Sequence, residues 1–159
     1  MVDKTNVMRI LDQKKIKYNS HYYGDTDAIS GVEVADVLGQ DVSKVFKTLV
    51  TVGKTKKNYV FVIPVAEELD LKKAAKAVGE KSIEMIKSKE LLPLTGYIHG
   101  GCSPIGMKKF FRTTIDESAL NCETFCISAG KIGYQIELSL DELKMVIKGD
   151  LAPLTIKES

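Results

Sequence analysis

The spacing of hydrophobic residues along the chain predicts a mixture of helices and strands. In several segments, apolar residues recur three and four positions apart, after a Thr, Ser or Asp whose side chain can cap a helix. We expect helices at 5–15, 30–39, 70–78 and 139–148, and a short helix that opens at Ser88 and is limited by Pro93 and Gly96. Runs rich in β-branched and aromatic residues predict strands at 16–23, 44–52, 59–63, 81–85, 109–115, 124–128 and 134–138.

The connections between these strands indicate the fold class. Turns at 53–58 and 129–133 join neighbouring strands into hairpins, and no regular βαβ repeat is present. Residues 1–159 contain no internal repeat, low-complexity tract or linker. We therefore expect a single α+β domain, in which helices pack around a curved, mixed or largely antiparallel sheet with a barrel-like shape.

Lys47 is out of place in the run 45–50, which otherwise has the composition of a buried strand. Strand alternation puts Lys47 on one face with Leu49, and Thr48 on the other. Because both faces are mainly apolar, protein should cover both. An ammonium group is rarely buried without a partner. Lys47 therefore either extends to water at an edge of the sheet or lines a pocket that serves a ligand.

Composition and charge narrow the functional classes. The chain is 44% hydrophobic, yet no apolar run approaches the ~20 residues of a membrane helix. The first residues enter a helical pattern directly, without a secretory signal, which predicts a cytoplasmic protein. Residues 44–112 hold 14 of the 23 Lys and Arg but 6 of the 21 Asp and Glu, an asymmetry that suits an anionic partner such as RNA. With Arg9 and Arg112 the only arginines, attraction to phosphates fits better than base reading.

The cysteines and histidines form no metal-binding or disulfide pattern. An odd number of cysteines, three, argues against a disulfide framework in a cytoplasmic protein. Cys122 and Cys126 lie four positions apart, but no second Cys or His pair accompanies them. Only His21 and His99 are available as imidazole ligands or bases, and neither lies in a triad pattern. We expect no metal site and no cofactor.

Two glycine-containing segments are candidate ligand-binding loops. Residues 96–106 contain four glycines, and the adjacent Gly100 and Gly101 either expose N–H donors to a developing oxyanion or form a tight turn. Ser128 precedes the second such turn, at the end of a strand. It lacks the elbow pattern of hydrolase nucleophiles, so it is a pocket residue or a structural one.

Four motifs occur together, in order, and give a resemblance to a known family. They are Val45-Phe46-Lys47-Thr48-Leu49-Val50, Pro64-Val65 followed by Leu69-Asp70-Leu71-Lys72-Lys73, Gly96 to Gly106, and Ser128 to Leu138. This ordered set, which spans roughly residues 5–151, resembles the YbaK/EbsC family. Members of that family are free-standing relatives of the editing domain inserted in bacterial prolyl-tRNA synthetases.

The resemblance implies trans-editing, in which a wrong amino acid is removed from a charged tRNA. The expected substrate is cysteine on tRNA(Pro), together with Cys-tRNA(Cys), and the substrate thiol would attack its own ester. The implied partners are the terminal adenosine end of aminoacylated tRNA and prolyl-tRNA synthetase, with no DNA and no membrane. The alternatives are a sister-branch deacylase for alanine or another small amino acid, and a non-catalytic tRNA-binding or regulatory module of the same fold.

The resemblance also implies roles for individual residues. Lys47 matches the family's essential lysine and is the expected catalytic residue. A second set is expected to bind the substrate: Tyr23 (or its neighbour Tyr22), Thr48, Gly100, Gly101, Ser128 and Gln135. Where this chain has Gln135, the family often has an acid. Because glutamine is neither a base nor an anion, a mechanism that needs a carboxylate there would have to use Glu137.

Overall fold

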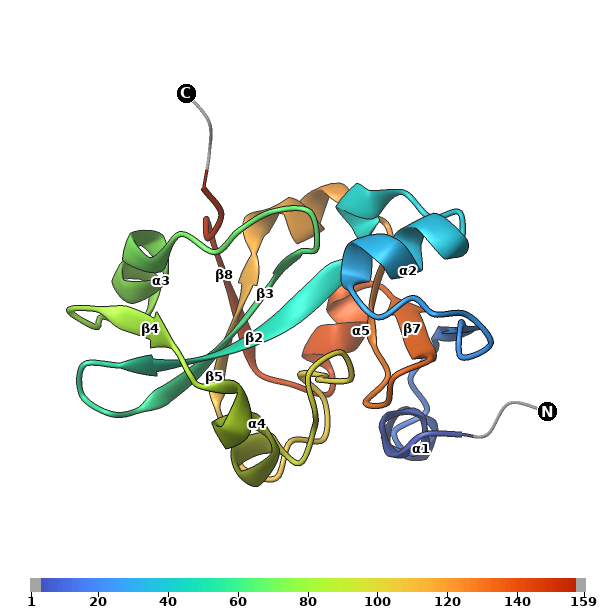
Figure 1. Cartoon of the computed structure of the whole chain (residues 1–159), viewed down its shortest axis with the longest axis horizontal. Coiled ribbons are helices and arrows are strands. Elements are labelled where there is room, and N and C mark those ends of the chain that lie inside the picture. The colour runs from blue at the N-terminus through green and yellow to red at the C-terminus, as the bar shows by residue number, and fades with distance from the viewer. Residues whose placement is uncertain (1–3, 157–159) are drawn as a thin grey trace.

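The computed structural model describes residues 4–156, which form two open β-sheets with helices around them (Figure 1). The α-helices are α1 (Asn6–Gln13), α2 (Gly31–Val37), α3 (Leu71–Val78), α4 (Ser88–Thr95) and α5 (Leu140–Lys144), and the 3₁₀ helices are η1 (Val42–Lys44) and η2 (Glu117–Asn121). The strands are β1 (Asn19–Tyr22), β2 (Phe46–Gly53), β3 (Asn58–Pro64), β4 (Ile83–Met85), β5 (Arg112–Asp116), β6 (Phe125–Ser128), β7 (Tyr134–Leu138) and β8 (Gly149–Ala152). The predicted α+β class is confirmed.

The two sheets differ in size and in strand direction. The larger sheet has the order β4-β2-β3-β5-β8, with antiparallel pairs around β2 and parallel pairs on both sides of β5. The smaller sheet has the order β1-β7-β6 and is antiparallel throughout. A single parallel bridge between Val45 and Cys126 links the sheets at the start of β2. The described strands therefore form a mixed arrangement that does not close into a barrel.

The main hydrophobic core fills the space between the sheets. Phe46 of β2 and Phe125 of β6 lie with ring centroids 4.9 Å apart, and both are buried. Helix α1 contributes Val7 and Leu11, which have no exposed surface, to the same core. Burying such a side chain stabilises the fold by about 1.5–3 kcal/mol. This core holds β2 against the smaller sheet.

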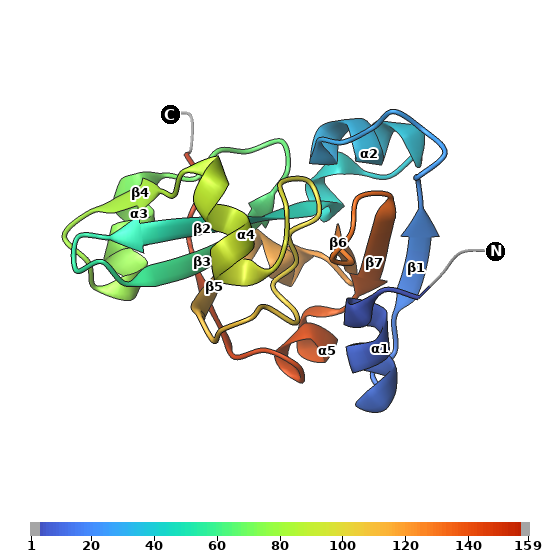
Figure 2. The ribbon, with the colours of Figure 1, turned by 60° about the horizontal axis from the view of Figure 1, so that its bottom comes forward.

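A second core lies on the other face of the larger sheet, under α3. Phe61 and Ile63 of β3 pack there against Ala74 of α3. Both views place α3 on one face of the larger sheet and α4 on the other (Figure 1, Figure 2). Because β3 is covered on both faces, it is almost continuously apolar, as buried strands with parallel neighbours usually are.

The helix ends follow the predicted capping residues. The side chains of Thr5, Ser30, Asp70 and Ser139 each accept a hydrogen bond from a backbone N–H of the first helical turn. Gly79 ends α3 with φ +75°, a left-handed conformation that favours glycine. Short polar signals in the sequence therefore located four of the five α-helices.

The structure differs from the sequence-based prediction near residue 148. The helix predicted at 139–148 ends at Lys144, and β8, which was not predicted, follows at Gly149–Ala152. The sequence of β8, Gly-Asp-Leu-Ala, has no β-branched residue, so its propensity for strand is low. Its parallel pairing with β5 makes it a strand. The first and fifth strands are also shorter than the predicted 16–23 and 109–115.

We expect Asp116→Ala to destabilise the protein by about 1–3 kcal/mol. Asp116 is buried, and its carboxylate accepts hydrogen bonds from the backbone N–H of Leu154, at 2.9 Å, and of Ser118, at 3.2 Å. Both amides would lose their acceptor. Urea unfolding measures the change. Asp150→Ala is the matched control, since its exposed carboxylate makes only a 3.6 Å ion pair with Arg112. Equal effects of the two variants would contradict the expectation.

Candidate functional site

A cavity of about 290 Å³ lies where the larger and smaller sheets separate, beside their linking bridge. Its walls come from α2, from the first residues of β2, from the glycine-rich loop after α4, and from β6 and β7. We call it the Lys47 cavity. The residues named in the sequence analysis that line it are Tyr23, Lys47, Thr48, His99, Gly100, Ser128 and Gln135, and Cys102 lines it as well.

Lys47 lines the cavity instead of extending freely into water. Its side chain is half-buried, and its Nζ donates a hydrogen bond to the carbonyl oxygen of Val65 at 3.3 Å. Burial lowers the pKa of the Lys47 amine below its ordinary value, and the carboxylate of Glu68 opposes part of this shift. The amine is thus a cation held partly out of water, where its field acts strongly on a bound ligand.

Thr48 also contributes to the cavity wall, although strand alternation predicted that its side chain faces away. Its Oγ1 is buried and has no hydrogen-bond partner among the described residues. A buried hydroxyl without a partner costs about 1–3 kcal/mol. The hydroxyl of Thr48 is therefore a buried polar group next to Lys47 in the chain, and it has almost no surface through which a ligand could reach it.

The structure distinguishes the two candidate tyrosines. Tyr23 is buried and lines the Lys47 cavity. Tyr22 is exposed and does not line it; its ring packs edge-on against Tyr134, with centroids 5.1 Å apart. Tyr23 is therefore the candidate for contact with a ligand.

Gly100 and Gly101 have different surroundings. Gly100 lines the cavity with φ +88°, and a Cβ there would lie 3.1 Å from Ile29 of the segment before α2. The N–H of Gly101 instead donates to the carbonyl of Ile98 at 3.0 Å, within the loop. A Cβ at Gly101 would lie 3.1 Å from the backbone nitrogen of Ile132. Gly101 allows two loops to pack closely, and Gly100 is the one that faces the cavity.

Ser128 and Gln135 sit opposite each other on β6 and β7 and both line the cavity. The Oγ of Ser128 accepts a hydrogen bond from Gly130 N–H at 3.1 Å. The side-chain amides of Gln135 and Gln40 hydrogen-bond to each other in both directions, at 2.6 and 3.2 Å. Gln135 is thus a fixed, uncharged wall of the cavity, and Gln40 is a supporting residue that sequence analysis missed.

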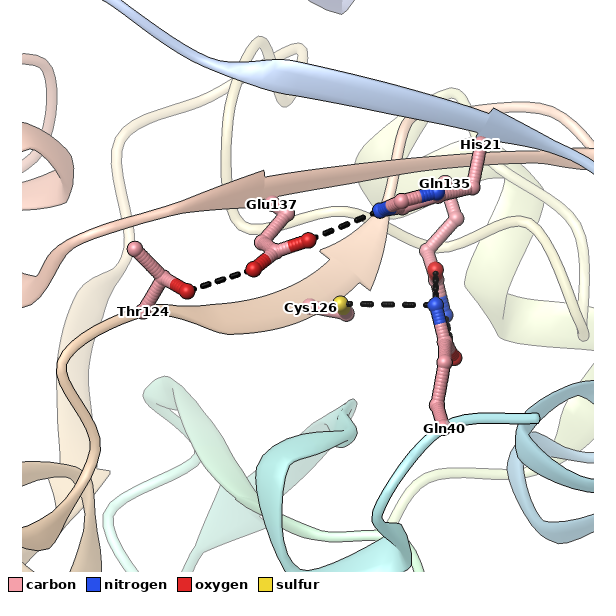
Figure 3. A network of polar contacts seen from close by, with 6 residues as sticks. All are labelled: His21, Gln40, Thr124, Cys126, Gln135 and Glu137. Atoms are coloured by element: carbon pink, nitrogen blue, oxygen red, sulfur yellow. Dashed lines mark hydrogen bonds and ion pairs between the residues drawn. The ribbon is translucent and has the colours of Figure 1, made fainter. Parts of the chain in front are cut away.

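Glu137 does not replace the missing acid in the cavity wall. It is absent from the cavity lining, and its carboxylate accepts hydrogen bonds from Thr124 and from His21, the latter at 2.8 Å (Figure 3). The hydrogen bond from Thr124, followed by that from His21, lowers the pKa of Glu137. Glu137 is therefore a structural anion that stabilises the smaller sheet.

The same network brings together three groups of metal-binding type, which their sequence separation did not suggest. The Nε2 of His21, the Sγ of Cys126 and a carboxylate oxygen of Glu137 lie within 4.8 Å of one another. Zinc accepts all three donors. Burial raises the pKa of the Cys126 thiol to about 12, however, so a thiolate ligand would form against this shift. All three groups already take part in hydrogen bonds. His21 bonds to Glu137 at 2.8 Å, and Gln40 Nε2 donates to the Cys126 sulfur at 3.7 Å.

Cys102 and His99 are the other potentially reactive groups of the Lys47 cavity. Burial raises the pKa of the Cys102 thiol to about 12, so it is protonated at neutral pH and a poor nucleophile. His99 is exposed at the cavity edge. The arrangement offers a cation, hydroxyls and amides, which can position and polarise a ligand.

Sequence analysis also missed the contribution of α2. Ile29, Ser30, Gly31 and Val34 form one wall of the cavity. A Cβ at Gly31 would lie 2.1 Å from Cγ1 of Val65, the residue whose carbonyl holds Lys47. A glycine at the first position of a helix, where Ser, Pro or Glu would serve better, was the available signal for this close approach.

The chain matches the family described as "Aminoacyl-tRNA editing domain" over residues 26–146, which include every cavity residue except Tyr23. It therefore belongs to the aminoacyl-tRNA editing domain family. The chain is 47% identical, over 98% of its length and 95% of the relative's, to a protein of Enterococcus faecalis named "Putative Cys-tRNA(Pro)/Cys-tRNA(Cys) deacylase EbsC".

Solved structures share the fold at lower identity. One, described as "a putative trans-editing enzyme for prolyl tRNA synthetase", has a TM-score of 0.80 at 23% identity and covers 98% of this chain and 100% of that one. Another, a "hypothetical protein", has a TM-score of 0.86 at 21% identity, over 94% and 99% of the two chains. Among residues 4–156, no helix has the length and apolar character needed to cross a bilayer.

We expect Lys47→Met to raise the urea midpoint of unfolding near neutral pH. Burial lowers the pKa of Lys47, so the folded state disfavours the ammonium form, and removing the charge relieves this cost. As pH rises through the lowered pKa, the wild-type amine loses its proton in the folded state and the advantage of the variant shrinks. Lys54→Met, at an exposed position, is the control. A less stable Lys47→Met protein at neutral pH would show that the bond to Val65 outweighs burial.

Proposed function

We propose that this protein is a trans-editing deacylase that removes cysteine from Cys-tRNA(Pro) and Cys-tRNA(Cys). The observation that carries the proposal is the half-buried Lys47 amine in a small cavity with Tyr23, Gly100 and Ser128. Membership of the aminoacyl-tRNA editing family and the near full-length similarity to the Enterococcus faecalis protein support it.

The size of the Lys47 cavity suits a small amino acid. About 290 Å³ lies at the lower end of the range for ligand pockets. A synthetase pocket shaped for proline rejects similar or smaller side chains weakly, so a second site must remove the wrong product. A cavity with an apolar wall from Ile29 and Ile127 can hold a thiol-bearing side chain while the ribose end remains at the opening.

The reaction needs no nucleophile from the protein. The substrate thiol loses its proton to solvent, and its sulfur attacks the carbonyl carbon of its own ester. The bond from that carbon to the ribose oxygen then breaks, and the ribose oxygen takes a proton. The products are a cyclic thioester and tRNA with a free terminal hydroxyl. The protein contributes orientation and stabilisation of the negative oxygen that forms in between.

Lys47 is the group that stabilises this negative charge. Its ammonium can lie against the carbonyl oxygen, the ribose oxygen or the adenosine phosphate, and in a partly dry site each interaction is stronger than in water. The Ser128 hydroxyl, on the cavity wall, is available to the amino acid. Gln135 supplies an uncharged amide, so the mechanism uses no carboxylate at that position.

The proposal also covers the source of tRNA selectivity and the cellular location of the protein. The described residues form a single compact domain with no separate module for reading a particular tRNA. We infer that selectivity for tRNA(Pro) comes partly from a complex with prolyl-tRNA synthetase in the cytoplasm. Co-purification of the protein with the synthetase in the presence of tRNA(Pro) tests this.

A deacylation assay with four substrates tests the proposed activity. Cys-tRNA(Pro) and Cys-tRNA(Cys) should be cleared, whereas Ala-tRNA(Pro) and Ser-tRNA(Pro) should persist, because serine has nearly the shape of cysteine but lacks its thiol. Loss of alanine would place the protein in a sister branch. Loss of serine at the same rate would indicate attack by water. No loss from any substrate, with tRNA still bound, would make it a binding module.

We expect Lys47→Ala to lower kcat for Cys-tRNA(Pro) by at least about 100-fold. Cys102→Ala should keep much of the activity, because the thiol of Cys102 is protonated and is not a nucleophile in this mechanism. Single-turnover deacylation measures both, and circular dichroism confirms that both variants fold. The opposite ranking of the two variants would refute the assignment of Lys47.

We expect the rate of deacylation to rise and then fall with increasing pH. The rise follows ionisation of the substrate thiol, which has an ordinary pKa of about 8.5. The fall follows loss of the Lys47 proton, which comes at lower pH than for an exposed lysine because burial lowers its pKa. In Lys47→Arg, residual activity should show no alkaline fall, since the guanidinium stays charged. If the rate for Lys47→Arg falls at high pH as it does for the wild type, the fall belongs to another group.

A further inference from the structure

A second groove lies where the segment leading into β5 meets the end of α5. It has a volume of about 560 Å³ and is formed by residues 104, 106–111, 113 and 146–148. We call it the Phe110 groove. In Figure 2, the yellow-to-gold segment between α4 and β5 extends from the neighbourhood of α2 toward α5. The proposed deacylation chemistry uses none of the residues of this groove.

The rim of the Phe110 groove is strongly cationic. Lys108, Lys109 and Lys148 line it and are exposed, and none of the described residues that line it is acidic. Within residues 4–156, none of the three forms an ion pair, while the nearby Asp150 pairs with Arg112. Three uncompensated ammonium groups around one groove attract a polyanion.

Phe110 gives the groove an exposed aromatic surface. Its side chain is 76% exposed, the largest fraction among the large hydrophobic residues of the described chain. Met107, Phe111 and Ile147 also line the groove, and they are partly buried and pack on the main core. An aromatic ring that projects from an apolar floor, with lysines around it, is the combination that binds single-stranded nucleic acid by stacking and charge.

The cationic segment is held in place rather than free. The N–H of Lys108 donates to the carbonyl of Thr95 at 3.0 Å. The stem of Lys108 lies over Gly96, where an added Cβ would be 3.3 Å from its Cγ. Gly96 ends α4 with φ +86°. The backbone and the side chain of Lys108 thus both contact the end of α4. A fixed segment loses less entropy on binding than a free loop.

We propose that the Phe110 groove binds the unpaired nucleotides of the tRNA acceptor end, next to the adenosine that carries the amino acid. A base stacks on Phe110, and phosphates lie against Lys108, Lys109 and Lys148. This inference rests on the proposed function, because it places the rest of the same substrate. It also gives a role to two of the lysines between residues 44 and 112, Lys108 and Lys109.

The two sites lie close together along the chain. Cys102 lines the Lys47 cavity and Pro104 lines the Phe110 groove. Residues two apart have Cα atoms separated by at most about 7 Å. A stacked nucleic-acid strand advances about 3.4 Å for each nucleotide. The separation of these two lining residues is thus within the length of a few nucleotides.

The experiment compares two substrates on matched variants. Phe110→Ala, Phe110→Tyr and Lys109→Ala are assayed with Cys-tRNA(Pro) and with cysteine esterified to adenosine alone. Leu120→Ala and Lys54→Ala are the controls, since both residues are exposed and line neither site. Thermal unfolding of each variant checks the fold, which loss of the exposed Phe110 ring should not disturb.

We expect Phe110→Ala to raise KM for Cys-tRNA(Pro) about tenfold, with kcat little changed, and to leave the adenosine ester unaffected. Phe110→Tyr should retain the KM of the wild type, because its ring still stacks. In anisotropy measurements with uncharged tRNA, Lys109→Ala should reduce the slope of log affinity against log salt by about 0.7. The two control variants should show neither effect.

Three results would overturn the proposal. They are an unchanged KM for tRNA in Phe110→Ala, an equal rise in KM for both substrates, and normal tRNA binding with weakened binding of prolyl-tRNA synthetase. The last result would make the groove a protein-binding surface. Failure of the proposed function is a separate outcome, because the binding of uncharged tRNA by these variants can be measured even if no substrate is deacylated.

Discussion

The partial removal of the Lys47 ammonium from water is the constraint on which the site depends. The folded protein disfavours this charge, and the shifted pKa records the cost. Among residues 4–156, compensation is limited to the carbonyl of Val65 and the charge of the Glu68 carboxylate. A cation that its own protein leaves under-compensated interacts strongly with negative charge that develops on a ligand. The site is thus organised around a positive charge that the protein itself compensates only in part.

The cavity exists because the two sheets diverge just beyond their single bridge. Val45 pairs with Cys126, and the next residues of β2 separate from β6, which leaves Lys47 and Thr48 facing the gap. Helix α2 closes one side, and it can approach Val65 because Gly31 has no side chain. The main core holds this geometry in place, and it adjoins the cavity, because Phe46 and Ile127 belong to both.

Much of the fold was accessible from the sequence, because capping residues and strand composition are local signals. Thr5, Ser30, Asp70 and Ser139 located helix starts correctly. Strand β8 was not accessible, because its four residues have weak strand propensity and become a strand only by pairing with β5. The division into two sheets was hidden for the same reason: non-local pairing, rather than the composition of any strand, determines it.

The site was predicted in part. Lys47 was visible as a charge in an apolar run, and six of the seven predicted residues line one cavity. Gly101 allows two loops to pack closely. In the sequence, a glycine with this role looks the same as a glycine that binds a ligand. The choice of Tyr23 over Tyr22 needed the register of β1. Gln40 and the α2 wall were missed, because their contribution depends on contacts between segments far apart in the sequence, such as Gln40 with Gln135 and Gly31 with Val65.

The paired amides of Gln40 and Gln135 have a consequence for the evolution of this cavity. Each side chain uses both its oxygen and its nitrogen toward the other, so the pair is complementary only as two amides. A carboxylate at position 135 would set its oxygen against the oxygen of Gln40, unless residue 40 became a pure donor. The two positions should therefore covary among homologues, and a change of charge in the cavity wall would require substitutions in two distant parts of the gene.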